Sequence, residues 1–162
     1  MILIDTSGLL AALFPDQNHH EECARALREA KPPRILSPFV LAEIDSLILR
    51  YAGVEAEAAL IDEVARGVYD VEKFSRRDYA EIVRLLHRHA DLKIGLVDAS
   101  IIMLADRHDT KDVLTLDLRH FRAIRPITKK NFRILPFDSE PVAPLRTAPA
   151  PGRSRTRRAV RR

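Results

Sequence analysis

Two aspartates directly follow short apolar runs of the kind that form buried strands. Asp5 comes after ILI at 2–4, and Asp117 comes after VLTL at 113–116. If both runs are parallel strands of one sheet, the two carboxylates project from the same carboxyl edge and can meet there. Taken alone, Asp5 is better explained as a helix cap, because Asp, Thr and Ser all begin helices well.

Two further carboxylates lie on predicted helices. The neighbours of Glu43 three and four positions away are mostly apolar, so we expect it to lie largely within an apolar stripe, where an unpaired charge is costly. Asp45 lies about 200° around the same helix, so it cannot face the same pocket and either pairs across an interface or is solvated. Asp98 follows the turn at Gly95 and heads a core-facing stripe, although a carboxylate at this position commonly stabilises the helix dipole or acts as a cap.

The four acids Asp5, Glu43, Asp98 and Asp117 together indicate a metal site. Clustered carboxylates repel one another, and keeping several ionised at neutral pH requires a multivalent cation. Oxygen ligands without a Cys/His set indicate Mg²⁺ or Mn²⁺ rather than zinc. Such a centre suits phosphoryl transfer. The histidines offer no better site: His108 and His120 lie near acids, with no nucleophilic serine or cysteine motif beside them.

Alternating strands and helices must position these acids. Apolar and alternating segments predict strands at 2–4, 34–36, 68–74, 113–116 and 132–137. Helical periodicity and capping residues predict helices at 9–14, 19–30, 38–52, 55–66, 76–89 and 96–108. This order predicts an α/β fold, a three-layer α/β/α domain over residues 1–138 with a mainly parallel central sheet and right-handed crossovers.

Composition places further bounds on the protein. At 162 residues, with 46% hydrophobic and 31% charged residues, the chain suits one soluble domain. The single cysteine, Cys23, excludes an internal disulfide and favours the reducing cytoplasm. We expect no membrane span and no signal peptide, because the apolar runs are short and Asp5 interrupts the first of them.

The C-terminal segment differs from the rest of the chain. Seven arginines and no acid lie between Pro141 and Arg162, so the other residues carry a net charge of −3 although the whole chain carries +4. We expect residues 139–162, rich in Pro, Ala and Arg, to be a disordered basic tail. Its role is either a solubilising extension or a non-specific phosphate-binding arm.

Four ordered motifs give the chain a resemblance to a known family. IDTSGLLA, SPFVLAEIDSL, IGLVDASIIMLADR and VLTLDLRHF, followed by a closing RILP strand, resemble PIN-domain proteins of the VapC toxin ribonuclease type over about residues 2–136. The resemblance implies that Asp5, Glu43, Asp98 and Asp117 are catalytic, with the metal bound by Asp5 and Asp98. Thr6, Ser7 and Thr115 match hydroxyl residues of the family that orient acids or water.

The resemblance also implies partners and a substrate. It implies Mg²⁺ or Mn²⁺, hydrolysis of a phosphodiester in structured RNA such as tRNA or rRNA, a homodimer, and a VapB-type antitoxin. Basic residues after Asp117 are candidates for RNA binding, with a merely solvated face as the alternative: Arg119, Arg122, Lys129 and Lys130. A non-catalytic PIN-fold module that binds RNA or acts as a scaffold is the alternative function. It would tolerate loss of the acidic quartet, which this chain retains.

Deleting residues 141–162 tests the arm hypothesis. If the tail contacts phosphates, its loss should weaken RNA binding uniformly across sequences and flatten the salt dependence of affinity, without moving the cleavage position. RNA affinities of the full-length and truncated proteins over a salt series measure this. Superimposable curves would leave the tail with no role in RNA binding.

Overall fold

A five-stranded sheet forms the centre of the protein. The computed structural model describes residues 1–124 and 131–139. Its strands pair in the order β3-β2-β1-β4-β5, and every neighbouring pair is parallel. The strands are β1 (Ile2–Ile4), β2 (Arg34–Leu36), β3 (Asp70–Val71), β4 (Asp112–Leu114) and β5 (Arg133–Leu135). This confirms the predicted α/β class and the parallel sheet.

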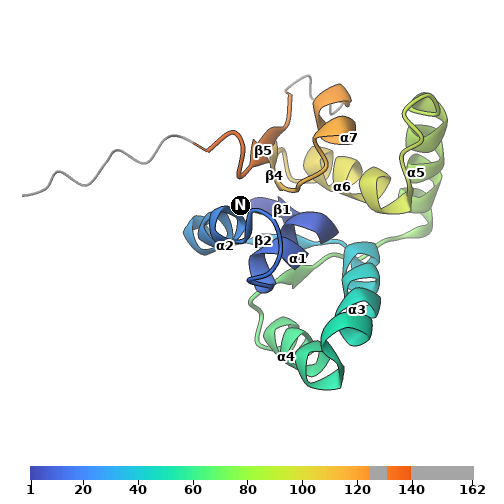
Figure 1. The fold of residues 1–162 in the computed structure, drawn as a ribbon. Coiled ribbons are helices and arrows are strands. Elements are labelled where there is room, and N and C mark those ends of the chain that lie inside the picture. The colour runs from blue at the N-terminus through green and yellow to red at the C-terminus, as the bar shows by residue number, and fades with distance from the viewer. Residues whose placement is uncertain (125–130, 140–162) are drawn as a thin grey trace, which may run out of the picture.

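Helices cover both faces of this sheet. They are α1 (Thr6–Leu13), α2 (His20–Glu29), α3 (Pro38–Ala52), α4 (Val54–Ala65), α5 (Arg76–Arg88), α6 (Leu96–Arg107) and α7 (Leu118–Ala123). The chain builds the sheet outward from β1 to β3 and then returns to β4, so right-handed crossovers place α1–α4 on one face and α5–α7 on the other. Figure 1 shows α3 and α4 on one side of the strands and α5, α6 and α7 together on the other.

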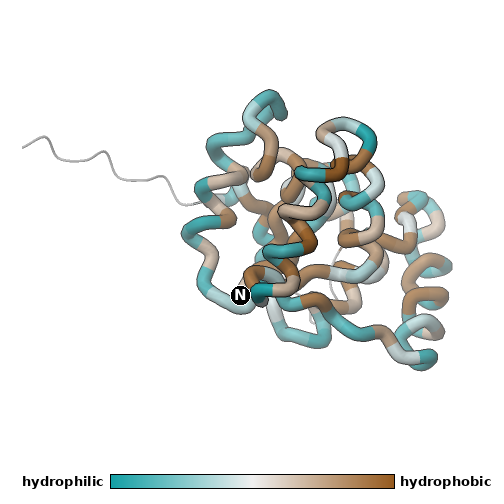
Figure 2. The backbone as a smooth tube through the Cα atoms, turned by 90° about the horizontal axis from the view of Figure 1, so that it is seen from below, coloured by the Kyte–Doolittle hydropathy of each residue, from teal (hydrophilic) through white to brown (hydrophobic). Residues whose placement is uncertain are grey.

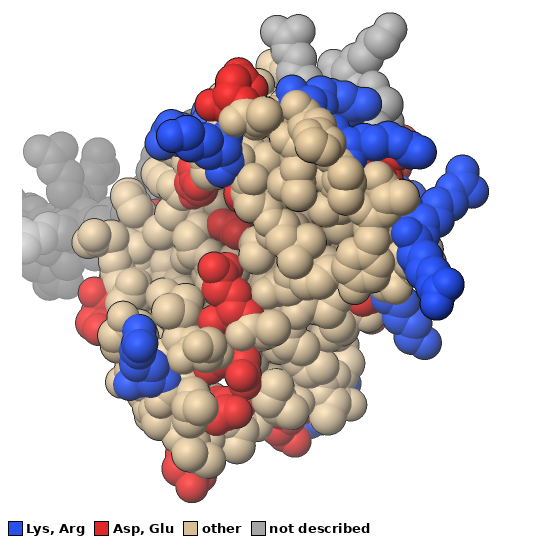
Figure 3. All heavy atoms as spheres, turned by 90° about the vertical axis from the view of Figure 1, so that its right-hand side faces the viewer, with Lys and Arg blue, Asp and Glu red and all other residues tan. Residues whose placement is uncertain are grey.

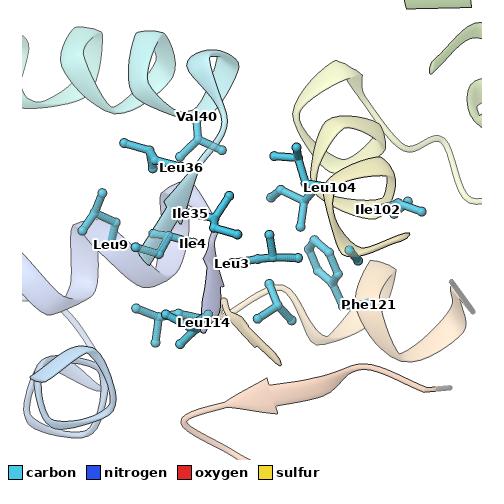
Figure 4. Packing of buried hydrophobic residues seen from close by; sticks show 14 of the residues in the cluster. Leu3, Ile4, Leu9, Ile35, Leu36, Val40, Ile102, Leu104, Leu114 and Phe121 are labelled. Atoms are coloured by element: carbon cyan, nitrogen blue, oxygen red, sulfur yellow. The ribbon is translucent and has the colours of Figure 1, made fainter. Parts of the chain in front are cut away.

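The core fills the space between these layers. All three residues of β1 are buried, as expected for a central parallel strand covered on both faces. Figure 4 shows Leu9 of α1 on one side of β1, with Leu104 of α6 and Phe121 of α7 on the other. Figure 2 shows many hydrophobic segments of the backbone in the middle of the molecule and hydrophilic segments at many of the outer turns. Among the described residues, no helix has the length and apolar character needed to cross a membrane.

Several element boundaries differ from those expected. The segment 68–74 contains only the two-residue strand β3, and α1 begins at Thr6 rather than at Leu9. Helix α7 was not predicted, because six residues are too few to show a helical period. The helix after Ser75 begins as expected: Ser75 and Asp78 form a capping box. Of the predicted tail, residues 139–162, the structure describes only Ser139, and the rest lies outside the described residues.

Gly8 allows α1 to lie directly against the end of β4. A Cβ atom at Gly8 would lie 2.4 Å from the carbonyl oxygen of Leu114, far inside van der Waals contact. The Leu114 carbonyl also accepts a hydrogen bond from the Asp5 amide, at 3.0 Å. The start of α1 and the end of β4 are therefore held together by backbone contacts, which brings residues 5–7 close to residues 115–117.

Gly8→Ala should destabilise the protein by about 1–3 kcal/mol, because the added methyl group clashes with backbone that cannot easily move. The sign of the change in the free energy of unfolding is informative, since Gly→Ala inside a helix ordinarily stabilises a protein by roughly 0.5–1 kcal/mol. Urea unfolding of the two proteins measures the change in the free energy of unfolding. A Gly8→Ala protein more stable than the parent would refute the close contact.

Candidate active site

Asp5 is the most deeply buried acid at the carboxyl edge of the sheet. Its residue is only 6% exposed. The hydroxyls of Ser7 and Thr115 donate hydrogen bonds to the same oxygen, Asp5 Oδ2, at 2.6 and 2.7 Å. Asp5 occupies the N-cap position of α1 but makes no side-chain capping hydrogen bond. The carboxyl group is thus oriented by neighbouring hydroxyls rather than used as a helix cap.

The environment of Asp5 disfavours its negative charge. Burial raises the pKa of the Asp5 carboxyl, and the nearby charge of Asp98 raises this pKa further. The hydrogen bonds from Ser7 and Thr115 act in the opposite direction, because they stabilise the carboxylate. A bound cation would offset both the burial and the repulsion.

Glu43 reaches the same edge from α3, but not in the way expected from the sequence. It is exposed, so the prediction that it lies within a buried apolar stripe is wrong. The buried stripe of α3 consists of Val40, Ile44 and Ile48, and Glu43 lies beside it. Because the helix is apolar on almost every side, its sequence did not reveal which side faces the core. Glu43 Oε2 accepts a hydrogen bond from the Thr6 hydroxyl at 2.5 Å, which holds this carboxylate beside the residue that follows Asp5.

Asp45 points elsewhere, as its position on the helix predicts. It lies beside Glu57 of α4, whose pKa is raised by desolvation and then by the hydrogen bond and negative charge of Asp45. Asp45 therefore belongs to the contact between α3 and α4 and not to the group around Asp5.

Asp98 and Asp117 are each fixed by a backbone amide. Asp98 Oδ2 accepts a hydrogen bond from the Gly95 amide at 2.9 Å, so Asp98 makes the capping contact that the sequence offered as the alternative for this residue. Asp117 Oδ1 accepts a hydrogen bond from the His120 amide at 3.0 Å. The Asp117 amide donates to the Thr115 hydroxyl, which links Asp117 to the group that binds Asp5.

His120 is a site residue that the sequence analysis missed. Its Nδ1 atom lies 2.9 Å from Asp117 Oδ2 and 3.4 Å from Asp98 Oδ2. The available signal was its spacing three residues after Asp117, which would place both side chains together if the segment were helical. Because α7 was not predicted, this spacing could not be interpreted.

The predicted RNA-binding residues have different surroundings. Arg122 makes two hydrogen bonds to Asp138, at 2.9 and 2.6 Å, so its charge is compensated within the protein. Arg119 is exposed and stays a candidate. Lys129 and Lys130 lie outside the described residues. Figure 3 views the molecule from the right-hand side of Figure 1. Acidic side chains run down the middle of this face, and basic side chains lie toward its margins.

These side chains offer a suitable donor set for a divalent metal. Ligand atoms of Asp98, Asp117 and His120 lie within 4.8 Å of one another. Asp5 is close enough to Asp98 for the charge of one to affect the other. The burial of Asp5 and its repulsion by Asp98 are the features that a bound cation would relieve.

The comparisons with known proteins identify the family of this chain. A model of the PIN domain family matches residues 2–127. This chain belongs to the PIN domain family. It is 35% identical over 135 residues to Ribonuclease VapC26 of Mycobacterium tuberculosis (strain ATCC 25618 / H37Rv), covering 83% of this chain and all of that protein. That match, which covers all of the relative, confirms the resemblance to VapC-type PIN-domain proteins.

Two solved structures share the PIN fold. One is Mycobacterium tuberculosis VapC20, described as a sarcin-ricin loop cleaving toxin, with a TM-score of 0.67 and 23% identity over 73% of this chain and 91% of that one. The other is a toxin-antitoxin complex from Klebsiella pneumoniae, with a TM-score of 0.60 and 22% identity over 78% of this chain and 94% of that one.

The raised pKa of Asp5 predicts how stability depends on pH. The pKa of Asp5 in the folded protein lies above the ordinary value of 3.8, because the fold favours the neutral carboxyl group over the carboxylate. The contribution of Asp5 to the free energy of unfolding is therefore complete below pH 3.8 and is lost as the pH rises through the folded pKa. Asp5→Asn stays neutral and keeps an oxygen that accepts both hydroxyls. We therefore expect Asp5→Asn to be more stable than the parent at pH 8 in EDTA, with a smaller difference at acidic pH.

Urea unfolding across pH in the presence of EDTA measures this difference. Asp91→Asn is the matched control, because Asp91 is exposed and should show no comparable gain in stability. If Asp5→Asn is the less stable protein at pH 8, burial and the charge of Asp98 do not disfavour the Asp5 carboxylate.

Proposed function

We propose that this protein is a divalent-metal-dependent endoribonuclease of the VapC toxin type that hydrolyses phosphodiester bonds in structured RNA. The observation that carries the proposal is the gathering of acids from separate elements at one sheet edge: Asp98 and Asp117 lie with His120 in one cluster, Asp98 is near enough to raise the pKa of Asp5, and Glu43 is bound by Thr6. They are linked by the Thr6, Ser7 and Thr115 hydroxyls and by His120. A scaffold would not need this arrangement of charges.

The residues of the chain have separable roles in this reaction. Asp5, Asp98 and Asp117 would hold Mg²⁺ or Mn²⁺. When bound, such an ion lowers the pKa of water and neutralises phosphate charge. Ser7 and Thr115 fix the plane of the Asp5 carboxyl, and the amides of Gly95 and His120 fix Asp98 and Asp117. Glu43 is exposed and positioned by Thr6, so its carboxylate is available to accept a proton from an attacking water.

The relatives support a proposal for the substrate and the partners. Because VapC26 is named a ribonuclease and VapC20 a sarcin-ricin loop cleaving toxin, we propose an RNA substrate, either rRNA or tRNA. The toxin-antitoxin complex supports neutralisation by a small VapB-type antitoxin. We also propose that the protein acts in the cytoplasm as a homodimer, as the resemblance to VapC toxins implies.

Asp98→Asn is the sharpest test of the nuclease assignment. The amide keeps the side-chain shape and an oxygen that can accept the Gly95 amide, but it removes one negative charge from the site. Cleavage of RNA should fall by at least about a hundredfold, and growth inhibition on expression should disappear. Single-turnover cleavage assays measure the first effect, and circular dichroism checks that the variant folds.

Asp45→Asn is the matched control. It is the same substitution two residues from Glu43, on the side of α3 that contacts Glu57, and it should leave cleavage nearly unchanged. Equal loss of cleavage in two folded variants would refute the assigned site. Full activity of Asp98→Asn would refute the role of Asp98.

A further inference from the structure

The Nδ1 atom of His120 has no hydrogen-bond partner although it is buried. Among the buried side-chain nitrogen and oxygen atoms of the described residues, it is the one left without a partner. Asp117 Oδ2 is 2.9 Å away but does not form a hydrogen bond with it. Buried polar atoms are almost always satisfied, so an atom of this kind indicates a further binding partner.

The atoms around Nδ1 have the separations of ligands that share one ion. Nδ1 lies 2.9 Å from Asp117 Oδ2 and 3.4 Å from Asp98 Oδ2. Two ligands at right angles, each about 2.1 Å from a cation, lie about 3 Å apart. The two separations from Nδ1 are close to that value, and the ligand atoms of all three residues lie within 4.8 Å of one another.

These ligand atoms are held in place by the protein itself. Backbone amides fix the two carboxylates, Asp98 through Gly95 and Asp117 through His120. The side chain of His120 is only 18% exposed. A cation would therefore enter a group that is already ordered, rather than one that must be assembled around it.

A simple ion pair explains the geometry less well. A protonated imidazole would neutralise the same two carboxylates, but its N–H would then donate a hydrogen bond to one of them. Nδ1 donates none. A nitrogen lone pair directed at a shared cation accounts for both the short distances and the missing hydrogen bond.

We infer that His120 is a ligand of the metal centre, binding the ion through Nδ1 beside Asp98 and Asp117. Mg²⁺ prefers all-oxygen surroundings, whereas imidazole nitrogen favours transition metals. The centre therefore binds Mn²⁺ in preference to Mg²⁺. The inference rests on the proposed function only in requiring that the site bind a divalent cation.

Mn²⁺ binding to the full-length protein tests the inference without an activity assay. Pulsed electron paramagnetic resonance of bound Mn²⁺ should show coupling to one ¹⁴N nucleus. In His120→Gln this coupling should vanish and the Kd for Mn²⁺ should rise by at least about tenfold, because a direct ligand matters at least as much as the residues that orient ligands. The Kd for Mg²⁺ should change less, since glutamine offers an oxygen.

His108→Gln is the matched control, because His108 contacts Glu72 rather than the site acids and should keep the coupling and the affinity. Bound Mn²⁺ without nitrogen coupling, or equal Mn²⁺ affinities in the parent and His120→Gln, would overturn the inference. If RNA cleavage persists in that case, the nuclease proposal stands. Nitrogen coupling in a protein that cleaves no RNA would refute the nuclease proposal alone, and a protein that binds no Mn²⁺ would refute both.

Discussion

Two hydroxyl groups, one from α1 and one from the residue that follows β4, donate hydrogen bonds to the same oxygen of Asp5. These bonds compensate part of the cost of burying a carboxyl group between two strands. They also require α1 to begin immediately after β1 and to lie against the end of β4, which Gly8 permits. The positions of Asp117 and His120 follow, because the Thr115 hydroxyl that contacts Asp5 also binds the Asp117 amide.

The charge distribution has two parts with different physical roles. At the sheet edge the charge of Asp98 lies close enough to raise the pKa of Asp5, whereas several basic residues elsewhere pair with acids inside the fold. Arg107 contacts Glu72 and Asp78, and Arg133 contacts Asp112. Such pairs connect elements and leave less positive charge available for nucleic acid. Under the proposed function, attraction to RNA would therefore rely on exposed basic residues such as Arg119 and, on the arm hypothesis, on the C-terminal arginines.

The sequence predicted those parts of the site that depend on strand order. Asp5 and Asp117 follow apolar strands, and parallel strands bring their carboxyl ends to one edge. It did not predict the exposure of Glu43, because a helix that is apolar almost all round has no unique inner face. It missed His120, because a six-residue helix is shorter than two turns and leaves no periodic signal. Tertiary packing, not the local sequence pattern, decides which side of α3 faces the core and where the side chain of His120 lies.

The backbone hydrogen bond from the Asp5 amide to the Leu114 carbonyl joins the site to the central strands. The amide of Thr115 is likewise bound, to the Leu135 carbonyl. Opening this edge would therefore mean breaking the ladder between β1, β4 and β5, which belongs to the slowest-exchanging part of a folded domain. Local melting is consequently a poor route to switching the enzyme off. Under the proposed function, control of the site would fall to molecules that cover it from outside.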